Sequence, residues 1–484
     1  MRHITIKAPG PSGEDGNLCS VRHTTFQYVI DQRDTSMDGL RRHLGASRFA
    51  FNQCLRLHLT ARRRTAERVP WSGFDLINVF NHWKKTAAAG RTFHVGRGGD
   101  AEVEVTGLRW RSEVCQQVFE QAAVDCGRAL GAWTASRRGK RKGRKVGHPH
   151  FKRKTDRSGS FRIRNKTSKN GRCSIRVGED HPRSIILSGV GTVRVFDDTR
   201  PLRRLLAKGR GKLLFATVRL QPSGRWTVSL NVQAEAMHGA RRHPGPAGRW
   251  VGVDRGLSAL AVAATSDGQE VLRIDAPKAL TRGLRKQRRF AKSVSRKAKG
   301  SANRRKAVRR LARHHETVAC RRKHFIHQLS NRLVKTHDRI CLEDLNTAGM
   351  LHNPKLARHI ADAAWATLHH QIAYKQAWAG GELLPADRWL PSSKTCSGCA
   401  TVKPLLDLSE RTFKCEACGL SIDRDLNAAI NLAAWAENHH VQAPERQADA
   451  RDTNVCREAR SGRTHRSGET SLREAGNPGQ PLAG

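Results

Sequence analysis

Three stretches of this 484-residue sequence decide its fold: VGVDRGLSALAV at 251–262, RICLEDLN at 339–346 and DRDLNAAINLA at 423–433. The first two are short apolar runs typical of buried strands, and the third has helical spacing after an acidic start. Each stretch presents a carboxylate at the end of its strand or at the start of its helix, namely Asp254, Glu343 and Asp425. Burying an ionised carboxylate without a partner is costly, so these positions indicate a bound cation.

Metal binding would explain all three acids together. Three carboxylates from distant segments can hold two Mg²⁺ ions about 3.5 to 4 Å apart, which activate a water molecule and stabilise the leaving oxygen of a phosphodiester. Each acid alone has a simpler explanation: Asp254 could form a turn or a salt bridge, and Glu343 with Asp344 could cap a helix. The order and the contexts of the three acids favour the metal site.

Two tight cysteine pairs lie between the second and third stretches: Cys396, Cys399, Cys415 and Cys418. Two C-x-x-C pairs separated by fifteen residues are typical of a four-thiolate zinc site, and this pattern favours one structural Zn²⁺ over chance pairs or a redox couple. Gly398 and Gly419 suit the tight turns of such a site. The other cysteines are scattered, which predicts free thiols in a reducing compartment.

The charge balance predicts a polyanionic partner. The chain has 89 Lys and Arg against 42 Asp and Glu, a net charge of +47, and nucleic acid is the expected source of neutralisation. A membrane surface is the alternative, but we find no long apolar span and no leader pattern. The basic run at 136–154 is expected to be a mobile loop, and the run at 282–323 a solvated helical region. We expect the histidines at 314, 315, 324 and 327 to lie on the solvent-exposed surface of that helical region.

The hydrophobic period changes along the chain. Helical spacing begins at Leu40 and again near Val114, and the period is two from about 158 to 236, which predicts a small β-barrel or sandwich. A Gly/Pro-rich boundary follows at 243–248. After it we expect strands at 250–254, 259–265, 269–274 and 339–342, a long helix at about 303–337, another helix at 356–378, and a tail without period from 437.

The three acidic stretches resemble the three RuvC motifs of TnpB proteins and compact type V CRISPR effectors. Two further stretches resemble that family: LRRHLGASRFAFNQCL at 40–55 and GHPHFKRKTDRSGSFRI at 147–163. The resemblance implies that Asp254, Glu343 and Asp425 are the catalytic acids and hold Mg²⁺, with Asp423 as a neighbour. Ala400 stands where the family usually has glycine.

The resemblance implies a multidomain α/β protein with an RNase H-like (RuvC) nuclease, a zinc ribbon insertion, and an N-terminal β-barrel wedge domain with an inserted helical recognition domain. The expected order is a first wedge segment (1–38), the recognition domain (39–135), a second wedge segment with a basic loop (136–248), the first two nuclease segments (249–391), the ribbon (392–422), the last nuclease segment (423–436) and a disordered tail (437–484).

The implied function is RNA-guided cleavage of double-stranded DNA next to a short flanking motif. Its partners would be a guide RNA and target DNA, its cofactors two Mg²⁺ and one Zn²⁺, and its location the bacterial cytoplasm, acting at the nucleoid. Two alternatives remain open: a non-catalytic DNA-binding repressor and a strand-joining transposase. The sequence leaves open whether the guide comes from a transposon end or a CRISPR array.

Overall fold

The computed structural model describes most of the chain between residues 21 and 440: 21–64, 68–95, 101–141, 143–154, 158–168, 170–235, 248–407 and 409–440. The described residues up to Asn438 belong to one compact unit. The expected features before residue 21, at 243–247 and after residue 440 lie outside the described residues. Among the described residues, no helix combines the length and apolar character needed to cross a membrane.

Two antiparallel sheets form the body of the first half of the chain, as far as it is described. The larger has the order β1-β9-β8-β4, from β1 (Val21–Val29), β4 (Gly159–Arg164), β8 (Gly211–Leu220) and β9 (Trp226–Glu235). The smaller contains β5 (Ile175–Val177), β6 (Ser184–Leu187) and β7 (Gly191–Arg194), and a bridge between Ile30 and Val195 links the two. The period-two block is therefore confirmed as β-structure, with one interruption that we did not expect, helix α4 (Arg200–Ala207).

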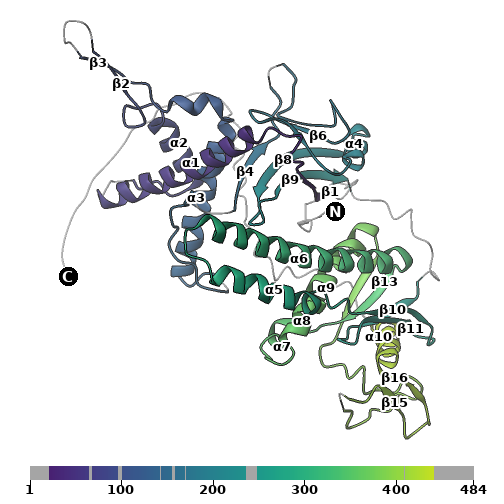
Figure 1. The fold of residues 1–484 in the computed structure, drawn as a ribbon. Coiled ribbons are helices and arrows are strands. Elements are labelled where there is room, and N and C mark those ends of the chain that lie inside the picture. The colour runs from purple at the N-terminus through teal and green to yellow at the C-terminus, as the bar shows by residue number, and fades with distance from the viewer. Residues whose placement is uncertain are drawn as a thin grey trace, which may run out of the picture. The chain divides into compact units, whose positions relative to one another are not determined.

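Helices fill the sequence between β1 and β4. They are α1 (Met37–Arg63), α2 (Gly73–Trp83), the short η1 (Arg109–Glu113) and α3 (Gln116–Arg137). Between α2 and η1 in the sequence, a hairpin of β2 (Thr92–Val95) and β3 (Ala101–Glu104) projects away from the helices (Figure 1). Side chains of these helices, such as Leu55 and Phe119, share one apolar core with strand residues such as Ile163. Because β1 pairs with β9, the helices form an insertion within the β-structure.

The basic run at 136–154 differs from the expected mobile loop. Its first two residues end α3, and Ser136 Oγ accepts a hydrogen bond from the Val146 N–H at 2.9 Å. Asn52 on α1 bonds to both backbone groups of Lys152, at 2.8 and 2.9 Å, and the Lys152 ammonium lies 3.7 Å from the centre of the Phe51 ring. The described part of this segment is thus docked on α1, through contacts that composition does not reveal.

The second half of the chain is built on a five-stranded sheet of order β12-β11-β10-β13-β14. Its strands are β10 (Trp250–Asp254), β11 (Ala259–Thr265), β12 (Glu270–Asp275), β13 (Arg339–Glu343) and β14 (Glu382–Ala386). β10, β11 and β12 pair antiparallel, whereas β10, β13 and β14 pair parallel. All seven residues of β11 are buried, because both faces of the sheet are covered.

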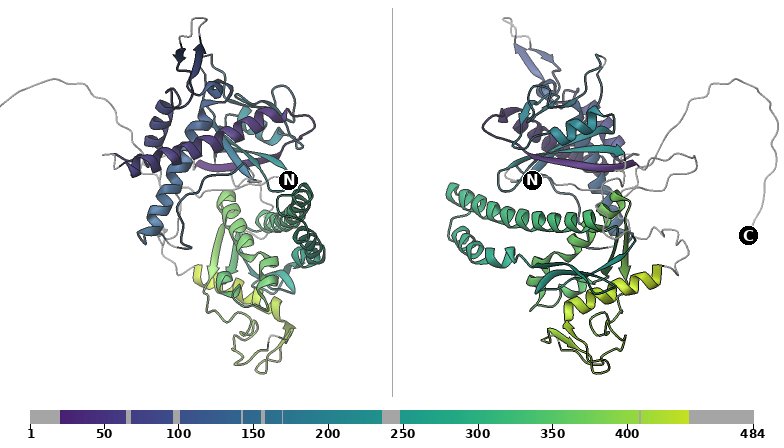
Figure 2. Two further views of the ribbon diagram at one scale, coloured as in Figure 1. Left: turned by 60° about the vertical axis from the view of Figure 1, so that its left-hand side comes forward. Right: turned by 90° about the vertical axis from the view of Figure 1, so that its right-hand side faces the viewer.

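Different helices cover the two faces of this sheet (Figure 2). Val251 and Val253 pack with residues of α6 (Ala302–Thr336), α8 (Ala357–Ala363) and α9 (Trp365–Ala379), whereas Trp250 packs against α10 (Arg424–His440). α5 (Ala279–Ser295) runs beside α6, and α7 (Thr347–Met350) precedes α8. β15 (Thr412–Lys414) and β16 (Ser421–Asp423) form a small hairpin before α10.

The expected elements of this half are confirmed with two corrections. The long helix and the four strands are present within a residue or two of their predicted bounds. The predicted helix at 356–378 is broken by Ala364, whose φ of 57° is left-handed, so α8 and α9 are separate. The predicted disordered tail begins too early, because residues 437–440 belong to α10.

Candidate metal centres

Strand register brings two of the predicted acids together. β10 and β13 are parallel, with Val253 opposite Leu342, so the next residues, Asp254 and Glu343, lie side by side as the last residues of their strands, at the carboxyl edge of the sheet. On the other side of β13, Glu343 pairs with Ala386 at the end of β14. Two acids that are 89 positions apart in sequence therefore lie at one edge of one sheet.

The third acid reaches this edge from α10. Asp425 is in the first turn of α10, and its Oδ2 lies 3.7 Å from the position that a Cβ on Gly256 would occupy, two residues after Asp254. α10 crosses β10 at Gly252, where a Cβ would lie only 2.1 Å from the carbonyl oxygen of Ala429. The glycine therefore permits the close approach that holds Asp425 beside Asp254.

Burial and mutual repulsion dominate the electrostatics of the acids. The pKa of Asp254 is raised well above its ordinary value, first by burial and then by the charges of Glu343 and Asp425, against opposing effects of Arg424 and Arg255. Burial also raises the pKa of Glu343. Such a group of carboxylates disfavours its own ionisation and favours a cation. The three acids are nevertheless less tightly gathered than the cysteines, which alone among the described residues bring three or more ligand atoms within 4.8 Å of one another.

Asp423 has a different environment from Asp425. Its Oδ1 accepts the Leu426 N–H at 3.0 Å and also contacts the Arg273 guanidinium at 3.0 Å. This carboxylate therefore caps the first turn of α10 and pairs with β12. The contacts support the interpretation of Asp423 as a neighbour, with Asp425 as the candidate ligand.

Two residues of this site were missed by sequence reasoning. Arg255 is only 5% exposed, and its guanidinium donates to the backbone carbonyls of Glu343 and Trp365. Ser392 Oγ donates to Glu343 Oε1 at 3.0 Å, which holds that carboxylate in place. Arg255 follows a predicted acid and Ser392 precedes a predicted cysteine, but nothing in either local pattern indicates a partner so far along the chain.

The four predicted zinc ligands lie together. Cys396 Sγ is 3.6 Å from Cys418 Sγ, and Cys399 Sγ is 3.6 Å from Cys415 Sγ, far beyond a disulfide bond of about 2.05 Å. Zn–S bonds of about 2.3 Å in a tetrahedron place the sulfurs about 3.8 Å apart, so the cluster fits Zn²⁺. With four protein ligands, the ion would have no open position and would serve as a structural centre.

The two knuckles of this cluster differ in their backbone. Gly419 has a φ of 73° in the second knuckle, as the prediction for a tight turn requires. In the first knuckle the left-handed residue is Ala400, with a φ of 61°, whereas a Cβ on Gly398 would meet only ordinary contacts at 3.5 Å and beyond. Ala400, which stands where the family usually has glycine, thus has the left-handed backbone that glycine adopts most easily.

Amide side chains fix the zinc cluster to α10. Asn427, which is fully buried, accepts the Ser397 N–H at 3.0 Å and donates to the Thr395 carbonyl at 2.7 Å. Asn431, one turn later, donates to the carbonyls of Ser392 and Thr395 at 2.8 and 2.6 Å. The helix that carries Asp425 is therefore bound to the segment that carries Cys396.

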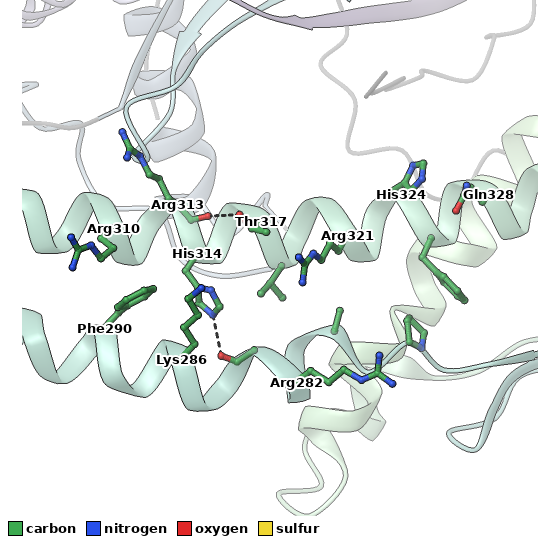
Figure 3. A pocket seen from close by; sticks show the side chains of 15 residues that line it. Arg282, Lys286, Phe290, Arg310, Arg313, His314, Thr317, Arg321, His324 and Gln328 are labelled. Atoms are coloured by element: carbon green, nitrogen blue, oxygen red, sulfur yellow. Dashed lines mark hydrogen bonds between the residues drawn. The ribbon is translucent and has the colours of Figure 1, made fainter. Parts of the chain in front are cut away.

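A basic pocket lies between α5 and α6, away from the two candidate metal sites (Figure 3). Its volume is about 620 Å³, and none of its fifteen lining residues is acidic. The cations around it are Arg282, Lys286, Arg310, Arg313 and Arg321. His314 donates to the carbonyl of Gly283 at 3.0 Å, which links the two helices. Such a pocket suits phosphate groups.

Comparisons with known proteins match both halves of the site. A family described as "Probable transposase" matches residues 229–353, which contain Asp254 and Glu343. A family described as "Cas12f1-like, TNB domain" matches residues 365–432, which contain the four cysteines and Asp425. A Cas12f1 chain solved in a complex with sgRNA and target DNA gives a TM-score of 0.46 at 14% identity over 82% of each chain, values too low to indicate function.

Relatives in several bacteria align with most of this chain. A "Putative RNA-guided DNA endonuclease" of Mycobacterium tuberculosis is 34% identical over 87% of this chain and 88% of its own length. The "Putative RNA-guided DNA endonuclease InsQ" of Escherichia coli K12 is 25% identical over 85% of this chain and 92% of its own length. A "Putative RNA-guided DNA endonuclease" of Streptomyces pristinaespiralis is 43% identical over 45% of this chain and 52% of its own length. About a third of the aligned residues are identical to those of the Mycobacterium tuberculosis relative across nearly the full length of both chains, and the matched family segments contain the three acids and both cysteine pairs. The chain therefore belongs to the TnpB family.

Proposed function

We propose that this protein is an RNA-guided DNA endonuclease that hydrolyses phosphodiester bonds at Asp254, Glu343 and Asp425. The observation that carries the proposal is the meeting of these acids at the carboxyl edge of one sheet, where burial, followed by the charges of Glu343 and Asp425, raises the pKa of Asp254. A structural role would not place like charges together. A nuclease site needs such a group, because the carboxylates become ligands of divalent cations.

Mg²⁺ fits this donor set, because its preferred ligands are carboxylate oxygens. When bound, two such ions would supply an activated water and would stabilise the leaving oxygen of the phosphodiester. The chain's own residues prepare the site: Ser392 orients the Glu343 carboxylate, and Arg255 holds the backbone at the end of β13. Asp425 is positioned by α10, whose buried face packs on the sheet.

The sheet order supports assignment of residues 249–391 and 423–436 to an RNase H-like (RuvC) nuclease, because three antiparallel strands continue into two parallel ones. We assign the β-structure of the first half to the wedge domain, α1–α3 to the recognition domain and the cysteine cluster to a zinc ribbon. The excess of cationic residues fits a guide RNA paired with one strand of double-stranded DNA, in which base pairing reads the sequence and the protein reads a short flanking motif.

Two acids that are two residues apart provide the sharpest test. Asp425→Asn should abolish Mg²⁺-dependent cleavage, whereas Asp423→Asn should cut within a few-fold of the wild-type rate, because asparagine can still cap α10. The assay is cleavage of a plasmid bearing the target of the RNA that copurifies with the protein. Guide-RNA binding should be unchanged in both variants, which separates loss of chemistry from loss of assembly.

The same assay distinguishes the alternatives. If wild-type protein binds the target but leaves it intact with Mg²⁺, the protein is a non-catalytic DNA-binding repressor. Recovery of joined strands, in addition to linear ends, would favour a strand-joining transposase. Equal activities of the Asp425→Asn variant and the wild type would refute the assignment of the site itself.

A further inference from the structure

One aromatic side chain is exposed next to the candidate nuclease site. Trp389 is 85% exposed, the highest value among the large hydrophobic side chains of the described residues. Tryptophan gains more than most residues from burial, so an indole left in water beside a reactive site indicates a partner that covers it. The neighbours of Trp389 show how it is held there.

The backbone around Trp389 is fixed on both sides. Asp387 Oδ1 accepts the Trp389 N–H at 2.7 Å, and the Arg388 guanidinium binds Asp344, the residue after Glu343. Leu390 packs against the buried cluster formed by the sheet and α10. The segment is therefore anchored, and the indole between these anchors is held outward.

The same segment reaches the candidate catalytic carboxylate. Ser392, three residues after Trp389, donates to Glu343 Oε1. Three residues span at most about 11 Å, so the base of the indole side chain lies within that distance of a residue that touches the site. A DNA strand in position for cleavage would pass close to Trp389.

We propose that Trp389 stacks on an unpaired base of the DNA strand being cut, beside the scissile phosphate, and thereby positions that strand. This inference rests on the proposed nuclease function. Every base has an aromatic face, so stacking tolerates any sequence, as a guided enzyme requires. Trp389 would be a positioning residue, while the acids perform the chemistry.

The test uses the protein with its copurified guide RNA and a target that is already unpaired around the cut, so that unwinding does not limit the rate. Loss of one stacked base should raise the KM for DNA by about five- to 150-fold in Trp389→Ala, with a smaller effect on kcat. Trp389→Phe should recover most of the affinity. Phe74→Ala, which removes another side chain that is 82% exposed, is the matched control and should behave as wild type.

Abasic substrates identify the stacked base. Single abasic sites placed through the target around the cut should weaken wild-type cleavage at one or two positions, and Trp389→Ala should be insensitive to those same positions, because the partner is already missing. An unchanged KM in Trp389→Ala, or additive effects at every abasic position, would overturn the proposal while leaving the nuclease function intact. Absence of cleavage by wild-type protein would refute the proposed function, and the stacking role with it.

Discussion

Substitution of Gly252 by alanine should displace α10 and reduce cleavage. A Cβ at this position would lie 2.1 Å from the Ala429 carbonyl oxygen, 2.5 Å from the Ala433 nitrogen and 2.7 Å from the Leu432 Cβ. Two of these atoms are helix backbone, so no change of rotamer relieves the contact. Ordinary contacts begin at 3.4 Å, and α10 or β10 must therefore move by about 1.3 Å.

The expected magnitudes follow from this displacement. Overpacking of this kind costs about 1 to 3 kcal/mol of stability. A misplacement of about 1 Å at a reacting centre can cost about 10²-fold in rate, and Asp425 lies near the start of the displaced helix. Cleavage should therefore fall by about two orders of magnitude while the protein remains folded.

The assay is single-turnover cleavage at saturating target, together with thermal unfolding and guide-RNA binding. The matched control is Gly45→Ala on α1, where a Cβ would meet nothing within 4 Å and should be neutral or slightly stabilising. Cleavage by Gly252→Ala within about threefold of wild type, in a protein of normal stability, would refute the idea that this close packing positions Asp425.

Three further outcomes are expected. Burial and like charges raise the pKa of Asp254, so the stability of the Mg²⁺-free protein should fall as pH rises through that raised value. Asp254→Asn should reduce this fall, since burial still raises the pKa of Glu343, and the variant should unfold at a higher temperature than wild type at pH 8. Equal melting curves would contradict the electrostatics. Cys415→Ser should lose zinc, measured by elemental analysis. Its cleavage rate should also fall at least about tenfold, because Asn427 binds α10 to the cysteine cluster. Full activity without zinc would refute this coupling. Ala400→Gly should stabilise the zinc-bound cluster by about 1 kcal/mol, measured by chelator competition for zinc, because glycine adopts a left-handed backbone without strain. The control is Gly398→Ala, which should be neutral. No gain in stability would show that the left-handed backbone at Ala400 is not strained.

Helices and strands could be predicted from the sequence where apolar residues recur at regular spacing, because that spacing reflects which face is buried. The long helix at 302–336 and the strands around Asp254 and Glu343 were predicted because apolar residues recur with a helical or extended period. The three acids could be singled out as candidates because a carboxylate at the end of an apolar strand conflicts with its surroundings. Such a conflict is visible in a short segment.

Features that depend on distant partners could not be predicted. The side-chain amide of Asn52 meets Lys152 across 100 positions, and Ser392 meets Glu343 across 49, and nothing in either local segment indicates these bonds. The exposure of Trp389 could not be predicted either, because the local sequence, with Arg388 before it and Leu390 after it, is compatible with a buried or an exposed tryptophan. α2 is a different case: its capping box, Ser72 with Asp75, is a readable signal that was overlooked.

The two candidate metal centres are joined by one helix. Asn427 and Asn431 bind α10 to the backbone of the cysteine cluster, and Gly252 lets the same helix sit against the strand that ends in Asp254. The apolar cluster of this segment is small and includes two of the cysteines, packed with Phe413, so a share of the free energy of zinc binding should hold α10 in place. The position of Asp425 therefore depends on two contacts beyond the carboxylates themselves, one on the cysteine cluster and one on β10. A structural ion that never touches the substrate would in this way set the geometry of the acid that does.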